Sequence, residues 1–369
     1  MLTDVVVVGG GPVGLATALT LAGEGVRVTV LDDESPPEPR APGAIPLSAV
    51  GTEPLSDPAF RLGRDAMLRW KAWAGDWPEI HGALVEPEGL LVLEDDRVLS
   101  MDLLQKARAA AWDGVRRLDG AELEGLQAGL HYGSAVHFPD ILRLDAEAGL
   151  AALRDACQRA RVLIRHHLPV LGLEMRGTRV RGVRIMGEVV PGGVIILTQG
   201  ALASRMLDTL GRMLPLRTVP ETWALTRSAE PVVRPVVASG IAIRPSRSGT
   251  AEWIAPARVH GGGAPRVDAV ERLLQRGERV LRGAASSELL LVGHRLTTRT
   301  PDGLPFLGPW PDLEGLFIAV GLRGLEWLYA PLAAELAAGW TVSTEVPMDL
   351  SAFRPDRFRH ADWPDPEPI

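Results

Sequence analysis

The stretch Val5-Val6-Val7-Val8-Gly9-Gly10-Gly11-Pro12-Val13-Gly14 decides the fold of this chain. Four consecutive valines are typical of a central parallel strand that is buried on both faces. The glycines follow at once with the spacing Gly-x-Gly-x-x-Gly, and residues 15–22 continue as a helix pattern that ends at Gly23. A strand, a glycine turn and a helix in this order predict the first unit of a nucleotide-binding α/β sheet.

Each glycine of this motif has its own physical task. Gly9 permits the tight turn, Gly11 lets a pyrophosphate approach the backbone, and Gly14 lets the helix pack close to the strand. The helix start offers unpaired N–H groups and a positive dipole end to phosphates. A second apolar strand, residues 26–31, ends at two carboxylates that can accept hydrogen bonds from ribose hydroxyls. We therefore predict a dinucleotide site made of Gly9, Gly11, Pro12, Val13, Gly14, Asp32 and Asp33, in preference to an ordinary glycine turn.

Composition limits the remaining classes. The 369 residues suffice for about two domains, and a net charge of −7 gives a nucleic-acid partner no electrostatic support. The single cysteine, Cys157, excludes an internal disulfide framework and a cysteine-based metal site, and favours a reducing compartment. We find no signal segment and no apolar run long enough to cross a membrane, so we expect a cytoplasmic protein.

The histidines invite a metal interpretation that the spacing does not support. His131, His137 and the pair His166-His167 lack the spacing of a helical zinc motif and have no acid in helical register. We expect structural or surface roles for them and predict no metal site.

Strand patterns indicate two interleaved domains. Buried parallel-strand patterns occur at the start of the chain, at 194–200 and at 316–321, with alternating antiparallel patterns between them. This predicts an α/β fold in which a Rossmann-like parallel-sheet domain is interleaved with an antiparallel-sheet substrate domain. The predicted nucleotide-binding domain comprises 1–80, 140–210 and 295–369, and the substrate domain 81–139 and 211–294. Residues 66–77 predict a helix with a packed tryptophan face, and residues 89–99 predict a strand.

Three stretches together resemble the D-amino acid oxidase-like flavoprotein family, over nearly the whole chain. The first is the opening motif through Asp32. The second is His137-Phe138-Pro139-Asp140 followed by Leu144-Asp145-Ala146, a helix and a strand that closes at Gly200. The third and most specific is Thr300-Pro301-Asp302-Gly303-Leu304-Pro305-Phe306-Leu307-Gly308-Pro309, then a strand into Gly321 and a helix that contains Ala330-Pro331.

The resemblance implies an FAD-dependent oxidase or dehydrogenase for amines or amino acids, with hydride transfer from the carbon beside nitrogen to flavin N5. The flavin carries the redox chemistry, and the protein supplies position and electrostatics. Non-covalent FAD is implied, because Cys157 lies far from the C-terminal half-site. The lysine of sarcosine oxidase-like relatives has no counterpart, since Lys71 and Lys106 are the only lysines. The residues implied to hold the cofactor, beyond the opening motif, are Gly200, Gly321, Leu322, Arg323, Gly324, Leu325, Glu326 and Trp327.

The substrate positions of glycine oxidase-like relatives are altered here. Thr297 stands where those relatives have a carboxylate-binding arginine, Gly324 where they have a second contact, and Ala242 where they have a tyrosine. Nearby arginines could replace these groups, because residues two apart in a strand share a face; solvated strand charges are an equally weighted alternative. A carboxylate at Glu326 would disfavour an anionic reduced flavin. The candidate substrate and catalytic residues are Arg295, Arg299, Arg323 and Glu326, with Arg244 near the altered Ala242.

Three functional classes stay open at this point. The first is amine or amino acid oxidation, including a specialised biosynthetic substrate. The second is a catalytically degenerate flavin-binding subunit of a larger complex, suggested by Glu326 and the lost contacts. The third is a class A flavin monooxygenase, which shares the opening motif but needs a Gly-Asp-Ala-Ala-His segment that this chain lacks. A homo-oligomer or a partner subunit is compatible with all three.

Overall fold

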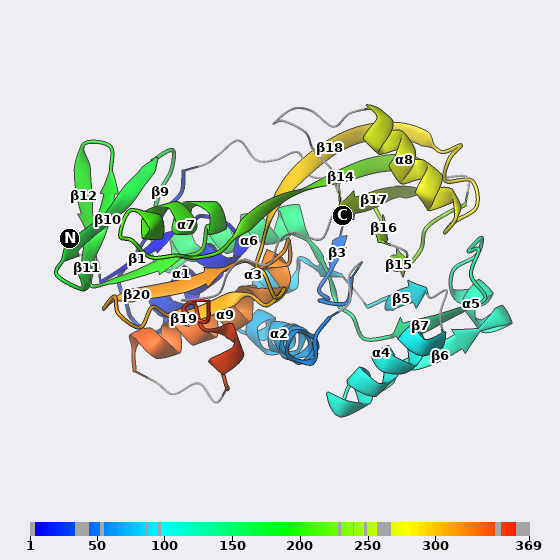
Figure 1. Cartoon of the computed structure of the whole chain (residues 1–369), viewed down its shortest axis with the longest axis horizontal. Coiled ribbons are helices and arrows are strands. Elements are labelled where there is room, and N and C mark those ends of the chain that lie inside the picture. Colours follow the sequence, from blue (N-terminus) through cyan, green and yellow to red (C-terminus); the bar gives the residue numbers. More distant parts are fainter. Residues whose placement is uncertain are drawn as a thin grey trace.

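The computed structural model describes residues 4–33, 44–51, 55–85, 87–93, 97–227, 230–238, 240–246, 249–256, 267–343 and 348–358. Two large sheets lie side by side and dominate the molecule (Figure 1). Two three-stranded sheets and a set of helices complete it. None of the helices within these ranges is long and apolar enough to cross a membrane.

The first large sheet is the nucleotide-binding sheet that the opening motif predicts. Its neighbouring strands are parallel except for one antiparallel pair at the edge, β19 with β20. Across the sheet the order is β19 (Phe306–Pro309), β20 (Leu316–Val320), β13 (Val194–Leu197), β1 (Val5–Val8), β2 (Val28–Leu31) and β9 (Leu163–Arg165). The valine run thus lies near the centre of the sheet, as predicted.

The two faces of β1 explain why all four of its residues are apolar. Val5 and Val7 pack in a core with α1 (Pro12–Gly23), α2 (Asp57–Gly75), α6 (Ala146–Arg159) and α9 (Glu326–Thr341). Val6 and Val8 pack on the opposite face against α7 (Gly200–Asp208) and a small antiparallel sheet of β10 (Val170–Arg176), β11 (Arg179–Ile185) and β12 (Glu188–Pro191). A strand covered on both faces has no polar side, so alternation is absent.

The second large sheet is antiparallel except where β15 pairs with β5. In order across the sheet it contains β18 (Glu288–Arg299), β14 (Arg217–Arg227), β17 (Thr250–Pro256), β16 (Ile241–Pro245), β15 (Val236–Ala238), β5 (Leu90–Leu93), β7 (Ser134–Phe138) and β6 (Arg116–Asp119). Helix α8 (Val267–Glu278) packs on one face with Ala224, Ile243 and Trp253. The opposite face carries the alternate residues of these strands and looks toward the nucleotide-binding sheet.

The remaining elements complete the two halves of the molecule. They are the small sheet of β3 (Ala44–Pro46), β8 (Arg143–Asp145) and β4 (Leu84–Val85), helices α3 (Pro78–His81), α4 (Arg97–Ala109) and α5 (Gly120–Leu126), and the 3-10 helix η2 (Ser351–Phe353). The packed tryptophan face is confirmed for Trp70 and Trp73, which are buried with ring centroids 5.6 Å apart. The strand predicted for residues 89–99 is wrong from Arg97 onward, because those residues belong to α4, and residues 94–96 lie outside the described residues. The alternation there was too short to separate a strand from the first turn of a helix.

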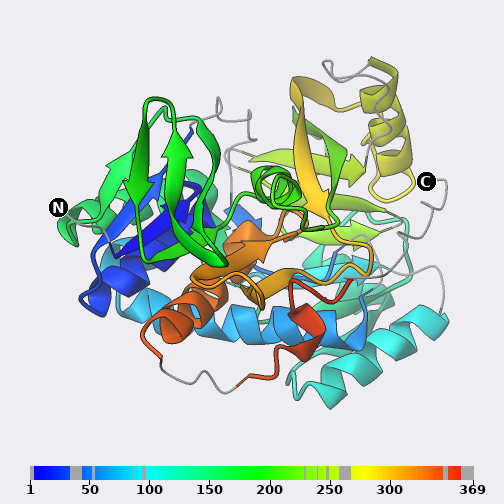
Figure 2. The ribbon, with the colours of Figure 1, turned by 60° about the vertical axis from the view of Figure 1, so that its left-hand side comes forward.

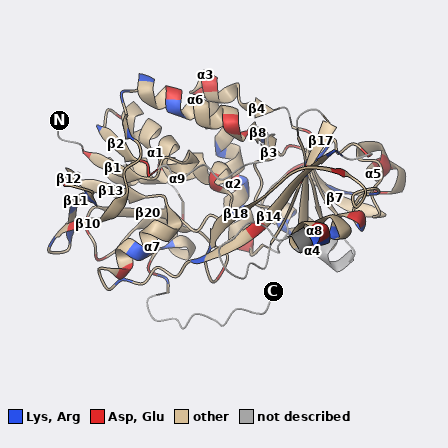
Figure 3. Cartoon of the chain, turned by 90° about the horizontal axis from the view of Figure 1, so that it is seen from above, with Lys and Arg blue, Asp and Glu red and all other residues tan. Residues whose placement is uncertain are grey.

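The chain passes between the two large sheets several times (Figure 2). It supplies β1 and β2 to the first sheet, β5 to β7 to the second, β9 and β13 to the first, β14 to β18 to the second, and β19 and β20 to the first. This alternation is the feature on which the predicted domain division rests. Basic and acidic residues are interspersed along the ribbons of both halves (Figure 3).

Candidate functional site

The glycine loop after β1 has the tight geometry that its spacing predicts. Gly9 adopts a φ of +119°, a region that disfavours side chains. A Cβ on Gly14 would lie 1.9 Å from the Gly9 carbonyl oxygen, whereas a Cβ on Gly11 would meet nothing within 4 Å. Gly14 therefore serves the packing of α1 against the loop, and Gly11 leaves open space at the amino end of that helix.

The carboxylate of Asp32 lies directly beside this loop. A Cβ on Gly10 would be 2.2 Å from Oδ2 of Asp32, so the backbone at Gly10 lies against this side chain. Asp32 is buried, and two side chains lie near its Oδ2 atom, Arg154 with Nη2 at 3.9 Å and His166 with Nδ1 at 3.7 Å. The next acid, Asp33, accepts a hydrogen bond of 2.9 Å from Gln199 Nε2 at the end of β13. The two acids predicted to bind ribose, Asp32 and Asp33, thus lie at the loop. His166, which the sequence did not indicate as a neighbour of Asp32, lies beside them.

A cavity of about 280 Å³ extends from this loop to the second sheet. Pro12, at the start of α1, forms one end of its lining, and residues 323–328 form the side next to α9. Ser48, Ala49, Val50 and Gly51 close it from the segment after β3. The far wall is the face of the second sheet that α8 leaves uncovered, including Glu221, Trp223, Ala242, Arg244, Glu252, Ile254, Arg295, Thr297 and Arg299.

A three-residue charge cluster occupies one part of that wall. Glu221 on β14 is paired across the strands with Arg295 on β18, and their Oε2 and Nε atoms are 2.6 Å apart. Arg299 Nη2 lies 3.5 Å from the other carboxylate oxygen. Burial pulls the pKa of Arg295 down, but Glu221 and the nearby Glu252 and Glu326 together raise its pKa above the ordinary value. One carboxylate, Glu221, thus contacts two guanidinium groups in this part of the wall.

A second ion pair lies on the neighbouring strands. Arg244 on β16 and Glu252 on β17 face each other in the ladder, and Arg244 Nη2 contacts Glu252 Oε2. Both side chains are buried, which lowers the pKa of Arg244, while Glu252 opposes that effect. The Nε atom of Arg244 is buried without a hydrogen-bond partner among the described residues. This pair therefore consists of one guanidinium group and one carboxylate.

An apolar strip separates the two charged groups. Trp223, Ile254 and Ala242 occupy successive strands of the same row in the sheet. The indole of Trp223 lies over Gly293 on β18, where a Cβ would approach its ring to 2.4 Å. Gly293 therefore makes room for the indole, which provides an apolar floor between the ion pairs.

The loop between β20 and α9 carries the residues implied to meet the flavin ring. Gly321, Arg323 and Gly324 adopt φ angles of +75°, +59° and +79°. The backbone N–H of Arg323 donates to the Thr298 carbonyl at 3.2 Å, which fixes this loop on the end of β18. A Cβ on Gly324 would be 3.3 Å from Nη2 of Arg295. The glycine at the altered family position thus leaves the space that Arg295 occupies.

The residues present fit FAD. Gly11 and the amino end of the 12-residue helix α1 form an open cradle beside Asp32, which suits a pyrophosphate and a ribose. At the other end of the cavity, the Nε1 atom of Trp327 is buried and has no hydrogen-bond partner among the described residues. A ligand with acceptor atoms would satisfy that donor. Cys157 is remote from the cavity: its Sγ donates to the Leu15 carbonyl at 3.4 Å, and burial raises the pKa of the thiol to about 12.

The structure therefore brings the four candidate substrate and catalytic residues into one cavity, whereas several predicted cofactor residues, including Asp32, Gly200 and Gly321, do not line it. Arg295, Arg299, Arg323 and Glu326 all line the cavity, and Arg295, Thr297 and Arg299 share its wall as the strand period predicts. Gly200 has a packing role, because a Cβ there would lie 2.7 Å from Thr298 Oγ1 on β18. The sequence did not indicate Glu221, Trp223 or Glu252 as residues of the site. They reach the cavity only because Glu221 and Trp223 pair with β18 and Glu252 pairs with β16.

The described histidines do not gather with other ligands. Among the described residues, no three His, Cys, Asp or Glu side chains form a group that could hold a metal ion. His137 lies on β7, where a Cβ on Gly89 would be 2.5 Å from its Nε2 atom. Burial, followed by the charges of Arg234 and Arg116, lowers the pKa of His137.

This lowered pKa predicts a pH dependence of stability. The unfolded state binds a proton as the pH falls through about 6.5, whereas folded His137 resists protonation, so the free energy of unfolding falls below that pH. We expect His137→Gln to reduce the loss of Tm between pH 7.5 and 5.5, measured by thermal unfolding. The exposed His81, changed in the same way, serves as the control. An unchanged slope for His137→Gln would contradict the assignment.

A glycine loop with a carboxylate beside it, next to a cavity shared with an antiparallel sheet, is typical of dinucleotide-dependent oxidoreductases. Comparison with known proteins gives the family. Residues 4–340 match the family described as DAO, FAD dependent oxidoreductase, and the chain belongs to that family. It is an FAD-dependent enzyme of the mixed α/β fold predicted above.

Individual relatives extend over nearly the whole chain. Glycine oxidase of Pseudomonas aeruginosa is 27% identical over 374 residues, covering 96% of this chain and 99% of the relative. Glycine oxidase of Geobacillus kaustophilus is 25% identical over 365 residues, covering 95% and 96%. The crystal structure of the G. kaustophilus enzyme superposes with a TM-score of 0.82 at 24% identity over 96% of this chain and 98% of that one. L-proline dehydrogenase from P. horikoshii gives 0.84 at 17% identity over 97% and 98%, and both structures show the same fold.

Proposed function

We propose that this protein oxidises a C–N bond of an amine or amino acid that is larger than glycine. The observation that carries the proposal is the cavity that reaches from Pro12 at the nucleotide loop to the charged face of the second sheet. FAD, when bound, supplies the electron acceptor for the hydride. The relatives named glycine oxidase support amine chemistry, and the altered cavity wall argues against glycine itself. In this proposal, segments 1–80, 140–210 and 295–369 hold the cofactor and 81–139 and 211–294 form the substrate domain.

The charge cluster supports a substrate with an acidic group. Arg295 and Arg299 both line the cavity beside Glu221, and guanidinium groups on a cavity wall suit the carboxylate of a substrate. Thr297 does not offer its hydroxyl, because that group donates to the Val219 carbonyl at 3.2 Å. We propose Arg295 and Arg299 as the residues that position the substrate, in place of the arginine that relatives have at Thr297.

Glu326 has a local explanation in this arrangement. It is the first residue of α9, where a carboxylate complements the positive end of the helix dipole. Its charge also acts on Arg295, whose guanidinium offsets it. We propose that Glu326 orients Arg295 at the edge of the cofactor site.

The single buried cysteine supports our prediction of a reducing, cytoplasmic setting.

The proposal is tested with purified protein supplied with FAD. We expect one flavin per chain and anaerobic bleaching of its absorbance by amines that bear an acidic group. Arg299→Gln should raise KM for such a substrate at least tenfold, which corresponds to one charge-assisted hydrogen bond of about 1.5–3 kcal/mol. Arg227→Gln is the matched control, because Arg227 belongs to an exposed pair on the same two strands.

Two outcomes would contradict the proposal in different ways. Protein that stays colourless with excess FAD would remove the cofactor assignment. Protein that binds flavin but is bleached by no amine in a broad panel would favour the alternative of a flavin-binding subunit of a larger complex. A class A monooxygenase would instead oxidise NADPH when a phenol is added.

A further inference from the structure

We propose that Arg357 is a positioning residue of the cofactor site. It holds the loop of residues 300–305, which joins β18 to β19, and through this loop it fixes Arg323 on the loop of residues 321–325, which joins β20 to α9. The second of these loops carries residues implied to meet the flavin ring. The proposal rests on the FAD dependence of the family and is independent of the amine substrate proposed above.

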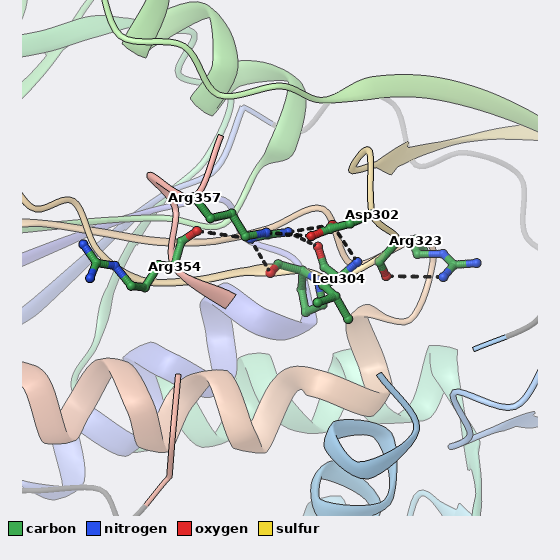
Figure 4. Close-up of polar contacts among 7 residues, drawn as sticks. Asp302, Leu304, Arg323, Arg354 and Arg357 are labelled. Atoms are coloured by element: carbon green, nitrogen blue, oxygen red, sulfur yellow. Dashed lines mark hydrogen bonds and ion pairs between the residues drawn. The ribbon is translucent and has the colours of Figure 1, made fainter. Parts of the chain in front are cut away.

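The guanidinium of Arg357 uses every one of its N–H donors. An arginine side chain has five such donors in a rigid plane. Nε and Nη2 donate to the Asp302 carboxylate at 2.8 and 2.9 Å, and Nη2 also donates to the Leu304 carbonyl at 2.6 Å. Nη1 donates to the Pro305 carbonyl at 3.2 Å and to the carbonyl of Arg354, in its own segment, at 3.1 Å. Four of these five hydrogen bonds thus reach the loop that joins β18 to β19 (Figure 4).

The surroundings keep Arg357 in this position. Its side chain is only 12% exposed, and its guanidinium carbon lies 4.0 Å from the centroid of the Phe306 ring on β19. Phe358 packs edge to face on the same ring, with the two centroids 6.1 Å apart. Phe353, in η2, is buried in the core that contains α9. A bidentate pair with a largely enclosed arginine therefore has a fixed geometry, unlike most exposed ion pairs.

Arg323 meets the same loop from the other side. Its Nη1 atom donates to the Gly303 carbonyl at 3.3 Å. Figure 4 shows Arg323 and Arg357 on opposite sides of Asp302. A Cβ on Gly303 would lie 3.0 Å from Nη1 of Arg323, so the backbone there is close to the guanidinium. Arg323 has a left-handed φ of +59°, which a residue other than glycine keeps only where its surroundings hold it, and the contact with Gly303 is one such constraint.

The two loops also pack on each other directly. A Cβ on Gly321 would lie 2.7 Å from Cγ2 of Thr300, so the loops leave no free space at that point. Arg323 lines the cavity that extends to the nucleotide loop, whereas Arg357 does not. A displacement of the first loop would therefore reach the cavity through these contacts. Arg357 thus fixes the shape of the cofactor site from outside it.

The first test measures FAD affinity apart from the stability of the fold. FAD released on dilution of the holoenzyme is measured by its fluorescence, and Tm is measured separately. We expect Arg357→Gln to weaken FAD binding about tenfold, comparable with the loss of a residue that orients a metal ligand. Arg354→Gln is the matched control, because its side chain is 56% exposed and pairs with Asp356 in the same segment. This control should leave FAD affinity unchanged.

The second test asks whether Arg357 acts through Arg323. Arg357→Gln and Arg323→Gln are made singly and together, and the losses of FAD affinity are compared. Effects that share one route are not additive, so Arg357→Gln should weaken FAD binding less than about twofold when Arg323 is already changed, which is the precision with which independent effects add. Additive losses would overturn the route through Arg323.

A spectroscopic measurement separates positioning from packing. We expect the visible circular dichroism of the bound flavin to change in Arg357→Gln and to stay the same in Arg354→Gln, because this signal depends on the surroundings of the ring. Asp302→Asn removes the paired charge from the other partner and should change affinity and dichroism in the same direction, so a poorly folded Arg357→Gln still leaves a decisive variant. A lower Tm with unchanged FAD affinity and dichroism would overturn the positioning role. These measurements need no amine, so a failure of the proposed function would leave their result intact.

Discussion

Gly14→Ala is expected to abolish FAD binding and to destabilise the folded protein. The added Cβ would lie 1.9 Å from the Gly9 carbonyl oxygen and 3.0 Å from the Gly9 carbonyl carbon, both of which are backbone atoms. Neither can rotate away, so α1 must move from the nucleotide loop. Overpacking typically costs about 1–3 kcal/mol, and a backbone clash belongs at or above the upper end. The flavin-to-protein ratio and urea unfolding measure the two effects.

Gly11 provides the matched control for this prediction. A Cβ at Gly11 meets no atom within 4 Å, so Gly11→Ala should unfold at nearly the same urea concentration as the original protein. Gly11→Asp places a carboxylate in the open space at the end of α1, where the pyrophosphate is predicted to bind. We expect this variant to fold and to lose FAD affinity at least a hundredfold. Full flavin content in Gly11→Asp would show that the dinucleotide does not bind at this helix end.

These two glycines show how much of the fold the sequence could predict. The order of strand, glycine loop, helix and acid is local, and local spacing is enough to place Gly9, Gly14 and Asp32 around one turn. The wall of the cavity depends on pairing between distant segments. Glu221 and Arg295 are 74 residues apart, and only the register of β14 against β18 makes them neighbours.

The two-residue period of a strand predicted the part of the wall on β18, but it could not predict the acids on the neighbouring strands. Residues 295, 297 and 299 were placed on a common face because side chains alternate along a strand. Whether that face was solvated or enclosed depended on the strands beside it, and a slip of one residue would have turned the face outward. The acids that fix the arginines, Glu221 and Glu252, are ordinary strand residues until the sheet is assembled. The substrate site is therefore a property of tertiary structure, whereas the nucleotide loop is visible in the sequence.

Glu221→Gln is expected to be the most disruptive change in the cavity wall. Glu221 is buried and compensates Arg295 and Arg299, whose side chains are also largely enclosed. Removing one partner of a buried ion pair costs about 3–5 kcal/mol, because the remaining charge stays desolvated. The same change raises the positive charge of the wall, so we also expect tighter binding of carboxylate ligands. Urea unfolding of the FAD-loaded protein and calorimetric titration with acetate measure these effects.

Glu288→Gln is the control that separates the effect of burial on stability from the effect of losing an ion pair. Glu288 pairs with Arg227 across the same two strands, β14 and β18, but both side chains are about 60% exposed. Exposed pairs contribute about 0–1 kcal/mol, so this variant should unfold almost as the original protein does. Glu221→Met combined with Arg295→Met should recover part of the stability lost by Glu221→Met alone, because an apolar pair leaves fewer uncompensated charges. Equal losses for Glu221→Gln and Glu288→Gln would mean that water reaches the Glu221 cluster freely, and Arg295 and Arg299 would then be too well screened to select an acidic substrate.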